Sequence, residues 1–282
     1  MLELPALPII RMHVLLQVEG GIPISSFPEA TIRGGLGYYL RSRTCLVPTR
    51  DCADCPLQKS CLFANLFEPE NGKSVAKSPR PKPWAISTKA CPNGMDLDVS
   101  FFGNYAMMLK PFLEALSSLG EVGIGAHKAR FAVKGFLEPQ RILLGDISFA
   151  TTSVQTLNIY TPMSLRLDGK RLSCWNTLAF ASTLLRRIYA LSALAEVPIP
   201  ADWNYRELLS EFSHVEAKFE TRPTQRTRFS THQNAKLEYP GFEGVVHLSG
   251  INETVAQLLT VGSAIGVGKN TVFGFGKYEV IA

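Results

Sequence analysis

Residues 266–276 read Gly266-Val267-Gly268-Lys269-Asn270-Thr271-Val272-Phe273-Gly274-Phe275-Gly276, so that two Gly-apolar-Gly triplets flank five residues that include one lysine. Glycine reaches positive φ without strain and lets a backbone approach a polyanion closely. Exposed N–H groups in such a loop can bind phosphate, and Lys269 adds a positive charge. A Walker loop is excluded because no Gly-Lys-Ser/Thr opens a helix, and a Rossmann fingerprint is excluded because the segment runs into an expected last strand at residues 273–281. The segment therefore indicates either a polyanion-binding loop or a purely structural glycine-rich hairpin.

In both halves of the chain, sequence patterns typical of strands alternate with patterns typical of helices. The first half has period-two apolar residues at 8–18, a helical pattern at 27–43, strand-like residues at 99–109, a short helix at 111–119 and a strand at 131–137. The second half has expected strands at 147–159, 215–229 and 244–248 and expected helices at 174–195 and 253–259. This order predicts an α+β fold of two tandem ferredoxin-like (split βαβ, RRM-like) domains, residues 1–140 and 141–282, with a cysteine-rich insertion.

Composition restricts the class of protein. The 282 residues are 46% hydrophobic and 19% charged, which excludes a disordered, collagen-like or small disulfide-rich chain. The net charge of +5 is a mild preference for polyanions and does not by itself indicate nucleic-acid binding. The longest apolar stretch, residues 177–197, is interrupted by Arg186 and Arg187, and Glu3 and Arg11 argue against a signal peptide. We therefore expect no membrane segment, a cytoplasmic protein, and cysteines that are reduced or metal-bound.

Four cysteines lie within 17 residues, at Cys45, Cys52, Cys55 and Cys61. A Cys-x2-Cys pair with two further thiols nearby suits tetrahedral thiolate coordination, so a structural zinc ion is predicted and an iron–sulfur cluster is the alternative. A catalytic metal is not expected, because no histidine lies near this loop and catalytic zinc usually keeps an open position. Reduced cysteines in a plain loop, or a redox-active pair, are further alternatives. The following stretch, residues 71–90, has five basic residues and no acid, and is expected to be an extended basic loop.

Four blocks of the chain, in order, carry a family resemblance. The glycine-rich segment resembles the glycine-rich loop of the RAMP superfamily of CRISPR-associated RNA-binding proteins. Residues 32–41, residues 45–69 and residues 226–233 are similar to the first helix, the cysteine-bearing stretch of a four-cysteine subgroup, and a C-terminal Arg-aromatic-Ser motif of its pre-crRNA-processing endoribonucleases. The resemblance implies tandem ferredoxin-like domains, binding of CRISPR repeat RNA, and one metal-independent cut in each repeat. In that reaction the 2′-hydroxyl attacks the adjacent phosphate and leaves a 2′,3′-cyclic phosphate and a 5′-hydroxyl.

This chemistry needs a general base, and histidine has an unperturbed pKa near 6.5. His232 lies in the most basic short stretch, without an acid from 221 to 237, and is the first candidate. The first helix has no histidine, so Tyr39 and Arg33 form the alternative catalytic set. The residues expected to bind RNA are Arg226, Arg228, Lys236, Gly266, Gly268, Lys269, Gly274 and Gly276. A non-catalytic RAMP subunit that holds guide RNA among effector-complex subunits is the alternative function.

Overall fold

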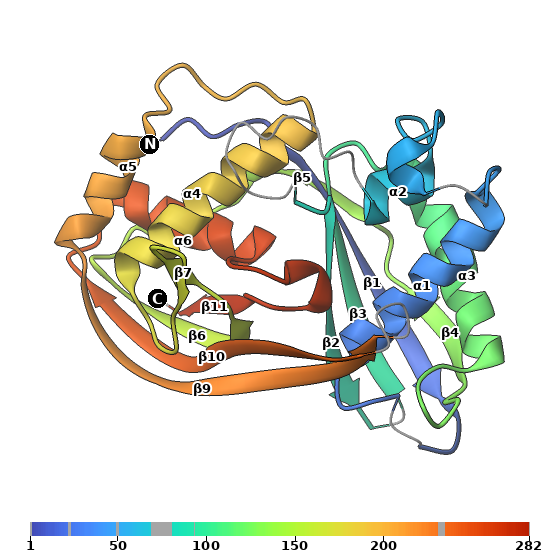
Figure 1. The fold of residues 1–282 in the computed structure, drawn as a ribbon. Coiled ribbons are helices and arrows are strands. Elements are labelled where there is room, and N and C mark those ends of the chain that lie inside the picture. Colours follow the sequence, from blue (N-terminus) through green and yellow to red (C-terminus); the bar gives the residue numbers. More distant parts are fainter. Residues whose placement is uncertain are drawn as a thin grey trace. The chain divides into compact units, whose positions relative to one another are not determined.

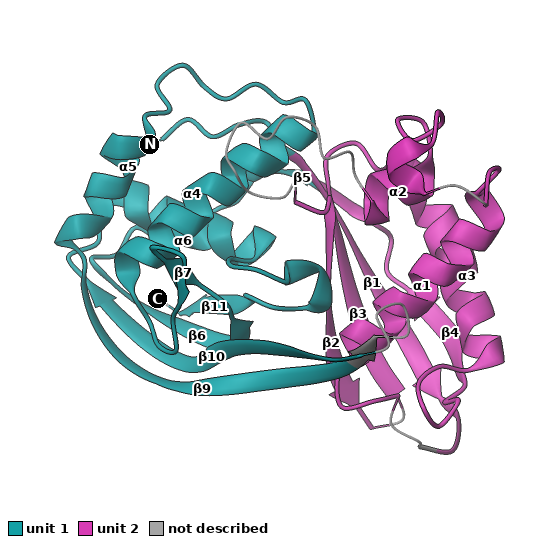
Figure 2. Ribbon diagram, in the orientation of Figure 1, with its two compact units in different colours: residues 1–7, 142–282 teal, residues 8–141 magenta. Residues whose placement is uncertain are grey.

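The computed structural model describes residues 2–21, 24–48, 51–68, 81–92, 94–230 and 235–281. Figure 2 shows that the chain divides into two compact units, residues 8–141 and residues 1–7 together with 142–282. The division near residue 141 is close to the predicted boundary, but the first seven residues belong to the C-terminal unit. Leu2 exchanges two hydrogen bonds with the Gln257 side chain, and Leu144 N–H donates to Leu7 O at 2.9 Å. These pairings join residues far apart in the sequence, which is why sequence patterns do not reveal them.

The N-terminal unit is a split βαβ fold with an inserted helix. Its elements are β1 (Pro8–Val18), α1 (Pro28–Thr44), α2 (Leu62–Phe67), β2 (Trp84–Cys91), β3 (Gly94–Phe102), α3 (Leu109–Val122) and β4 (Phe131–Phe136), and β5 (Gln140–Leu143) follows (Figure 1). The sheet has the order β2-β3-β1-β4, and each of these neighbouring pairs is antiparallel. This is the strand order of a ferredoxin-like domain, with α2 as the insertion between α1 and β2.

The C-terminal unit repeats the same topology. Its elements are β6 (Val154–Met163), β7 (Arg166–Leu167), β8 (Lys170–Arg171), α4 (Thr177–Leu194), α5 (Tyr205–Glu211), β9 (Glu216–Ser230), β10 (Ala235–Ser249), α6 (Glu253–Ile265) and β11 (Tyr278–Ile281). The sheet has the order β11-β6-β10-β9, again all antiparallel. The predicted tandem ferredoxin-like fold is therefore confirmed.

Strands β9 and β10 form a hairpin that is longer than the rest of their sheet. Their pairing runs from Glu216 opposite Ser249 to Ser230 opposite Ala235. Strand β6 pairs only with residues 242–249 of β10. The part of the hairpin beyond β6, residues 223–230 and 235–241, is a two-stranded ribbon, which Figure 1 shows as the long curved orange pair. The sequence pattern predicts β9 but only the last residues of β10, because Pro240 and Gly241 interrupt the apolar alternation.

Helix caps and glycines explain why the helices lie where they do. Asn176, Asn204 and Asn252 each accept a backbone N–H bond at the start of α4, α5 and α6, which satisfies donors that the helix itself leaves free. Gly35 lets α1 pack against α3, because a Cβ there would lie 2.5 Å from Leu119 Cδ1. This glycine of the first helix thus serves helix packing.

The expected basic loop and the expected last strand are among the sequence expectations that are wrong in detail. Residues 71–80 of the expected basic loop lie outside the described residues, but residues 84–90 belong to β2, where Trp84 and Ile86 are buried. The basic residues and prolines of the stretch concealed this short strand. The expected last strand at 273–281 begins only at Tyr278, because the preceding residues form a turn. No helix in the described part of the chain is long and apolar enough to cross a membrane.

Candidate nucleic-acid interface

The glycine-rich loop, residues 266–276, connects α6 to β11 by a chain reversal with repeated positive φ. The residues concerned are Gly266 (72°), Gly268 (111°), Asn270 (66°), Gly274 (80°) and Gly276 (72°). A Cβ on Gly276 would lie 1.9 Å from the carbonyl oxygen of Val267, and one on Gly268 would lie 2.9 Å from that of Ser164. The glycines are therefore required by the turn itself and by close backbone approach.

Most of this loop is buried, and several of its N–H groups are already bonded. Val267 N–H donates to Gly276 O at 2.8 Å, Gly276 N–H to Pro162 O at 3.0 Å, and Lys269 N–H to Ser164 O at 3.0 Å. These donors are not available to a phosphate. The Lys269 side chain is exposed, and partial burial of its ammonium together with nearby Arg166 and Arg171 lowers its pKa. The loop therefore presents a cationic side chain at a fixed position, and the bonded part of its backbone is structural.

The β9–β10 ribbon packs on this loop through Arg228. Its Nε donates to Tyr239 Oη at 2.9 Å, and its guanidinium carbon lies 5.8 Å from the Tyr239 ring centroid and 5.1 Å from that of Phe273. Stacking on two rings fixes the guanidinium. Arg228 is thus half-buried and supports the contact between ribbon and loop, a role that its sequence context did not indicate.

The other two cations predicted to bind RNA on this ribbon lie on different faces. The register pairs Arg226 with Tyr239 and Lys236 with Phe229, so consecutive alternation places Arg226 and Lys236 on opposite sides of the ribbon. Both are exposed. Arg226 Nη2 lies 3.8 Å from Glu243 Oε1, a partly exposed ion pair that competes only weakly with a phosphate. The ribbon therefore offers charge on both faces.

The candidate residues of the first helix are not brought together. Six positions on a helix separate Arg33 from Tyr39 by about 120° around its axis. The Arg33 guanidinium lies 5.2 Å from the Phe67 ring centroid, so it helps to dock α2 on α1. Lys82 Nζ donates to Phe67 O, and Trp84 Nε1 donates to Leu66 O at 3.2 Å, so the end of α2 is also bound to β2. Burial, with Arg33 nearby, lowers the pKa of Lys82.

The four cysteines lie between α1 and α2. All are free and partly exposed, Cys45 follows the last residue of α1, and Cys61 precedes the first residue of α2. Burial raises the pKa of Cys52, Arg41 opposes this, and the Cys61 and Cys45 thiols raise it further, which places these thiols in one neighbourhood. Within the described residues no three His, Cys, Asp or Glu side chains are arranged to hold a metal ion. The donor chemistry fits zinc, while the described loop is not closed around an ion.

The histidine chosen from the sequence, His232, lies outside the described residues. Among the described histidines, His13 is the one with two carboxylates close to its ring nitrogens. Its Nδ1 lies 2.8 Å from Asp98 Oδ1 and its Nε2 lies 3.6 Å from Asp96 Oδ1. The two acids alternate on β3 opposite β1, a period-two signal that a sequence search for paired acids would find. Two carboxylates repel a phosphodiester, so His13 is a poor candidate for the base.

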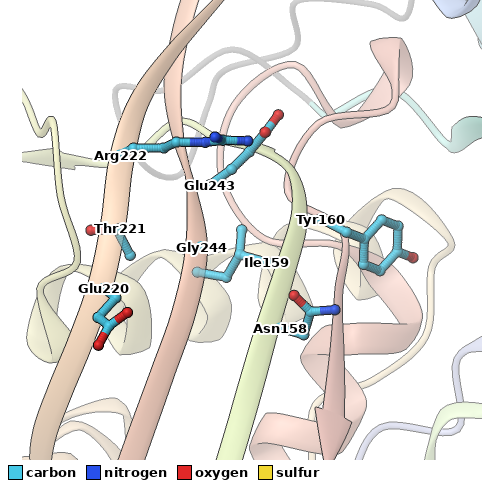
Figure 3. Close-up of a pocket in the computed structure, with 8 residues that line it drawn as sticks. All are labelled: Asn158, Ile159, Tyr160, Glu220, Thr221, Arg222, Glu243 and Gly244. Atoms are coloured by element: carbon cyan, nitrogen blue, oxygen red, sulfur yellow. The ribbon is translucent and has the colours of Figure 1, made fainter.

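A hollow of about 570 Å³ lies on the C-terminal sheet, and Figure 3 shows the Arg222 side chain pointing toward Glu243 on the neighbouring strand. Its lining residues are Asn158, Ile159, Tyr160, Glu220, Thr221, Arg222, Glu243 and Gly244. Two glutamates make the hollow unfavourable for a phosphate, whereas the half-exposed ring of Tyr160 offers a surface for an unpaired base. None of the residues predicted from the sequence lines it.

Several solved structures have a fold similar to that of this chain. A Cas6 product complex is 18% identical, with a TM-score of 0.62 and coverage of 98% of this chain and 100% of the other. Thermus thermophilus Cas6 is 16% identical, with a TM-score of 0.59 and coverage of 98% and 99%. A Cas6-related protein from Pyrococcus furiosus is 13% identical, with a TM-score of 0.51 and coverage of 97% and 98%. At these identities the likeness establishes the fold.

Family models cover both units. Residues 7–148 match a family described as an N-terminal domain, and residues 157–278 match the CRISPR-associated endoribonuclease Cas6 family. No curated protein matches the chain. The second match includes residues 226–233 and the glycine-rich loop, two of the four blocks that carry the resemblance in the sequence. Residues 157–278 of this chain are therefore a domain of the CRISPR-associated endoribonuclease Cas6 family.

Proposed function

We propose that this protein binds CRISPR repeat RNA and cuts once within each repeat to release mature crRNA. The 2′-oxygen attacks the adjacent phosphorus, the bond from phosphorus to the 5′-oxygen breaks, and a 2′,3′-cyclic phosphate and a 5′-hydroxyl result. One group takes the proton of the 2′-hydroxyl and another gives a proton to the leaving 5′-oxygen. No metal takes part in the proposed step.

The family match over residues 157–278 is the observation that carries this proposal. Among the similar solved structures, one is a Cas6 product complex and another is a RAMP protein binding different RNA substrates. In this chain the same region holds Arg226 and Lys236 on the two faces of the ribbon and Lys269 on the loop, all exposed. Exposed cations next to a fixed backbone suit a polyanionic ligand.

For catalysis we propose His232 as the general base, because its sequence neighbours are basic and attract the scissile phosphate. Tyr39 with Arg33 is the alternative set. The Arg33 guanidinium already lies against Phe67, and Tyr39 lies about 120° away from Arg33 around the helix axis. This makes His232 the first residue to test.

We further propose that Cys45, Cys52, Cys55 and Cys61 hold one structural zinc ion that joins the end of α1 to the start of α2. Four thiolates supply the tetrahedral, all-sulfur set that structural zinc prefers. The ion has no part in the cleavage chemistry. Association with effector-complex subunits stays a prediction from the sequence, and co-purification from the native host tests it.

The deciding experiment is cleavage of a host CRISPR repeat RNA by the purified protein in the presence of EDTA. We expect one cut per repeat, a cyclic phosphate and a 5′-hydroxyl, and no cut when a 2′-deoxyribonucleotide replaces the residue before the scissile bond. His232→Ala should lose cleavage and keep RNA affinity within a few-fold, while His214→Ala, a change at an exposed histidine outside the basic stretch, should cleave normally. Tight repeat binding without any cleavage by the wild type would instead establish the non-catalytic subunit.

A further inference from the structure

A small hairpin beside the glycine-rich loop carries two arginines that face each other. Strands β7 and β8 pair Arg166 with Arg171 and Leu167 with Lys170. The turn between them has positive φ at Asp168 (49°) and Gly169 (78°), the conformation that tight hairpins favour. Cross-strand partners lie on the same face of a hairpin, so Arg166 and Arg171 share one face and Lys170 lies on the other.

The glycine-rich loop brings a third cation to the arginine face. Lys269 N–H donates to Ser164 O at 3.0 Å, which binds the loop to the residues just before β7. Gly268 makes this approach possible, because a Cβ there would lie 2.9 Å from the same carbonyl. Burial is the main cause that lowers the pKa of the Lys269 ammonium, and the positive charges of Arg166 and Arg171 lower it further. Three cations from two separate segments therefore converge.

No carboxylate forms an ion pair with these three side chains within the described part of the chain, and Asp168 at the hairpin tip does not reach them. Arg166 Nη1 donates to Gly169 O at 3.2 Å, which aligns the guanidinium along the hairpin. Like charges directly opposite each other on a hairpin are destabilising. A cluster of this kind gains stability when a polyanion binds, and it favours phosphate over any neutral ligand.

We propose that Arg166, Arg171 and Lys269 form a clamp for the phosphodiester backbone of bound RNA. This inference rests on the proposed function and extends it, because it assigns the β7–β8 hairpin a place in RNA binding. The clamp contacts phosphates and carries no base specificity, so it strengthens binding of any RNA that reaches it. Lys170, on the opposite face of the same hairpin, takes no part.

The hairpin offers its own matched control. Each of three variants removes one clamp charge: Arg166→Gln, Arg171→Gln and Lys269→Gln. The control variant Lys170→Gln removes one charge from the same hairpin, next to Arg171 and four residues after Arg166. Affinity for a repeat RNA and for a scrambled RNA of equal length is measured from about 50 to 300 mM KCl, the range over which phosphate contacts weaken most visibly. Each clamp variant should lose roughly five- to tenfold in affinity at low salt for both RNAs, and the slope of log K against log salt should fall by about 0.7–0.9 per lost contact. Lys170→Gln should stay within about twofold of wild type, because it makes no phosphate contact.

Two outcomes would overturn the clamp. One is clamp variants that bind both RNAs with wild-type affinity and slope, and the other is a Lys170→Gln loss equal to theirs, which would mean that only overall charge matters. Melting temperatures close to wild type confirm that exposed substitutions leave the fold intact. The preference of the wild type for repeat over scrambled RNA tests the proposed function separately, because the clamp predicts the same losses on both RNAs whether or not that preference exists.

Discussion

Replacing Gly276 by alanine tests whether the glycine-rich loop is first a structural device. Gly276 has a φ of 72°, and a Cβ would lie 1.9 Å from Val267 O. Two other glycines separate the two effects. Gly169 has a φ of 78° with nothing within 4 Å of its Cβ position, and Gly34, in α1, also has open space there but no positive φ.

The expected magnitudes follow from these differences. Left-handed backbone costs an L-residue about 1–2 kcal/mol, which is the whole expected effect of Gly169→Ala. Gly276→Ala adds the clash, which must move a carbonyl and break the 2.8 Å bond from Val267 N–H to Gly276 O, worth about 1 kcal/mol net. The sum is about 2–3 kcal/mol of unfolding free energy. Gly34→Ala should stabilise α1 by up to about 1 kcal/mol, because alanine is the better helix former.

Calorimetric melting of the three variants provides the measurement. For a unit of this size 1 kcal/mol corresponds to about 2–4 °C, so Gly276→Ala should lower the transition of the C-terminal unit by roughly 4–12 °C. Gly169→Ala should lower the same transition by about 2–4 °C less than Gly276→Ala does, and Gly34→Ala should raise the transition of the N-terminal unit. If Gly276→Ala melts like Gly169→Ala, the close approach to Val267 O is not structurally required. Poor RNA binding by such a stable variant would mean that glycine is needed for RNA approach alone.

Three further predictions concern other parts of the chain. Purified protein should contain about one equivalent of zinc, as a single four-thiolate site requires, and Cys52→Ser should lose it and melt earlier than Cys91→Ser; zinc well below one equivalent in wild type contradicts the proposal. Burial raises the pKa of Tyr278, so only the unfolded state ionises just above about pH 10 and stability should fall as pH rises through that region; urea midpoints of Tyr278→Phe should lack this decline. Phe67→Ala should destabilise the N-terminal unit by about 3–5 kcal/mol in urea unfolding, because it removes a buried ring; a change below about 1 kcal/mol would contradict the docking of α2.

The parts of the fold that sequence could predict are those with a strong local period. Strand β1 matches its prediction, residues 8–18, because apolar and polar side chains alternate along it. Helices α1 and α4 lie within a few residues of their predicted ranges, because their apolar residues recur at helical spacing. Helix α2 was missed because its six residues hold too few turns to show a helical period. Strand β2 was missed because basic residues and prolines surround it, and its burial depends on packing against β3.

The candidate site was harder to predict because the role of each side chain depends on which residues of other segments it contacts. The sequence analysis assigns Arg228 and Lys269 to RNA binding, but Arg228 stacks on Tyr239 and Phe273 from other segments, which no local pattern reveals. Arg166 and Arg171 were overlooked since two arginines five residues apart are unremarkable until a tight turn places them opposite each other. The role of a charged side chain is decided by which opposite charges, rings or carbonyls the fold brings to it.

The buried Arg187 explains how the loop holds Lys269 in place before any RNA arrives. Its Nε and Nη2 donate to Ile265 O at 3.1 and 2.8 Å, at the carbonyl that precedes Gly266. Burial lowers its pKa to about 10, so the guanidinium is still charged at neutral pH and also stabilises the negative end of the α6 dipole. The loop thus starts at a fixed carbonyl and ends at the backbone bond between Val267 and Gly276. A loop fixed at both ends loses little conformational entropy on binding. The free energy of attraction between its lysine and a phosphate in the proposed clamp is therefore not offset by the cost of ordering the chain.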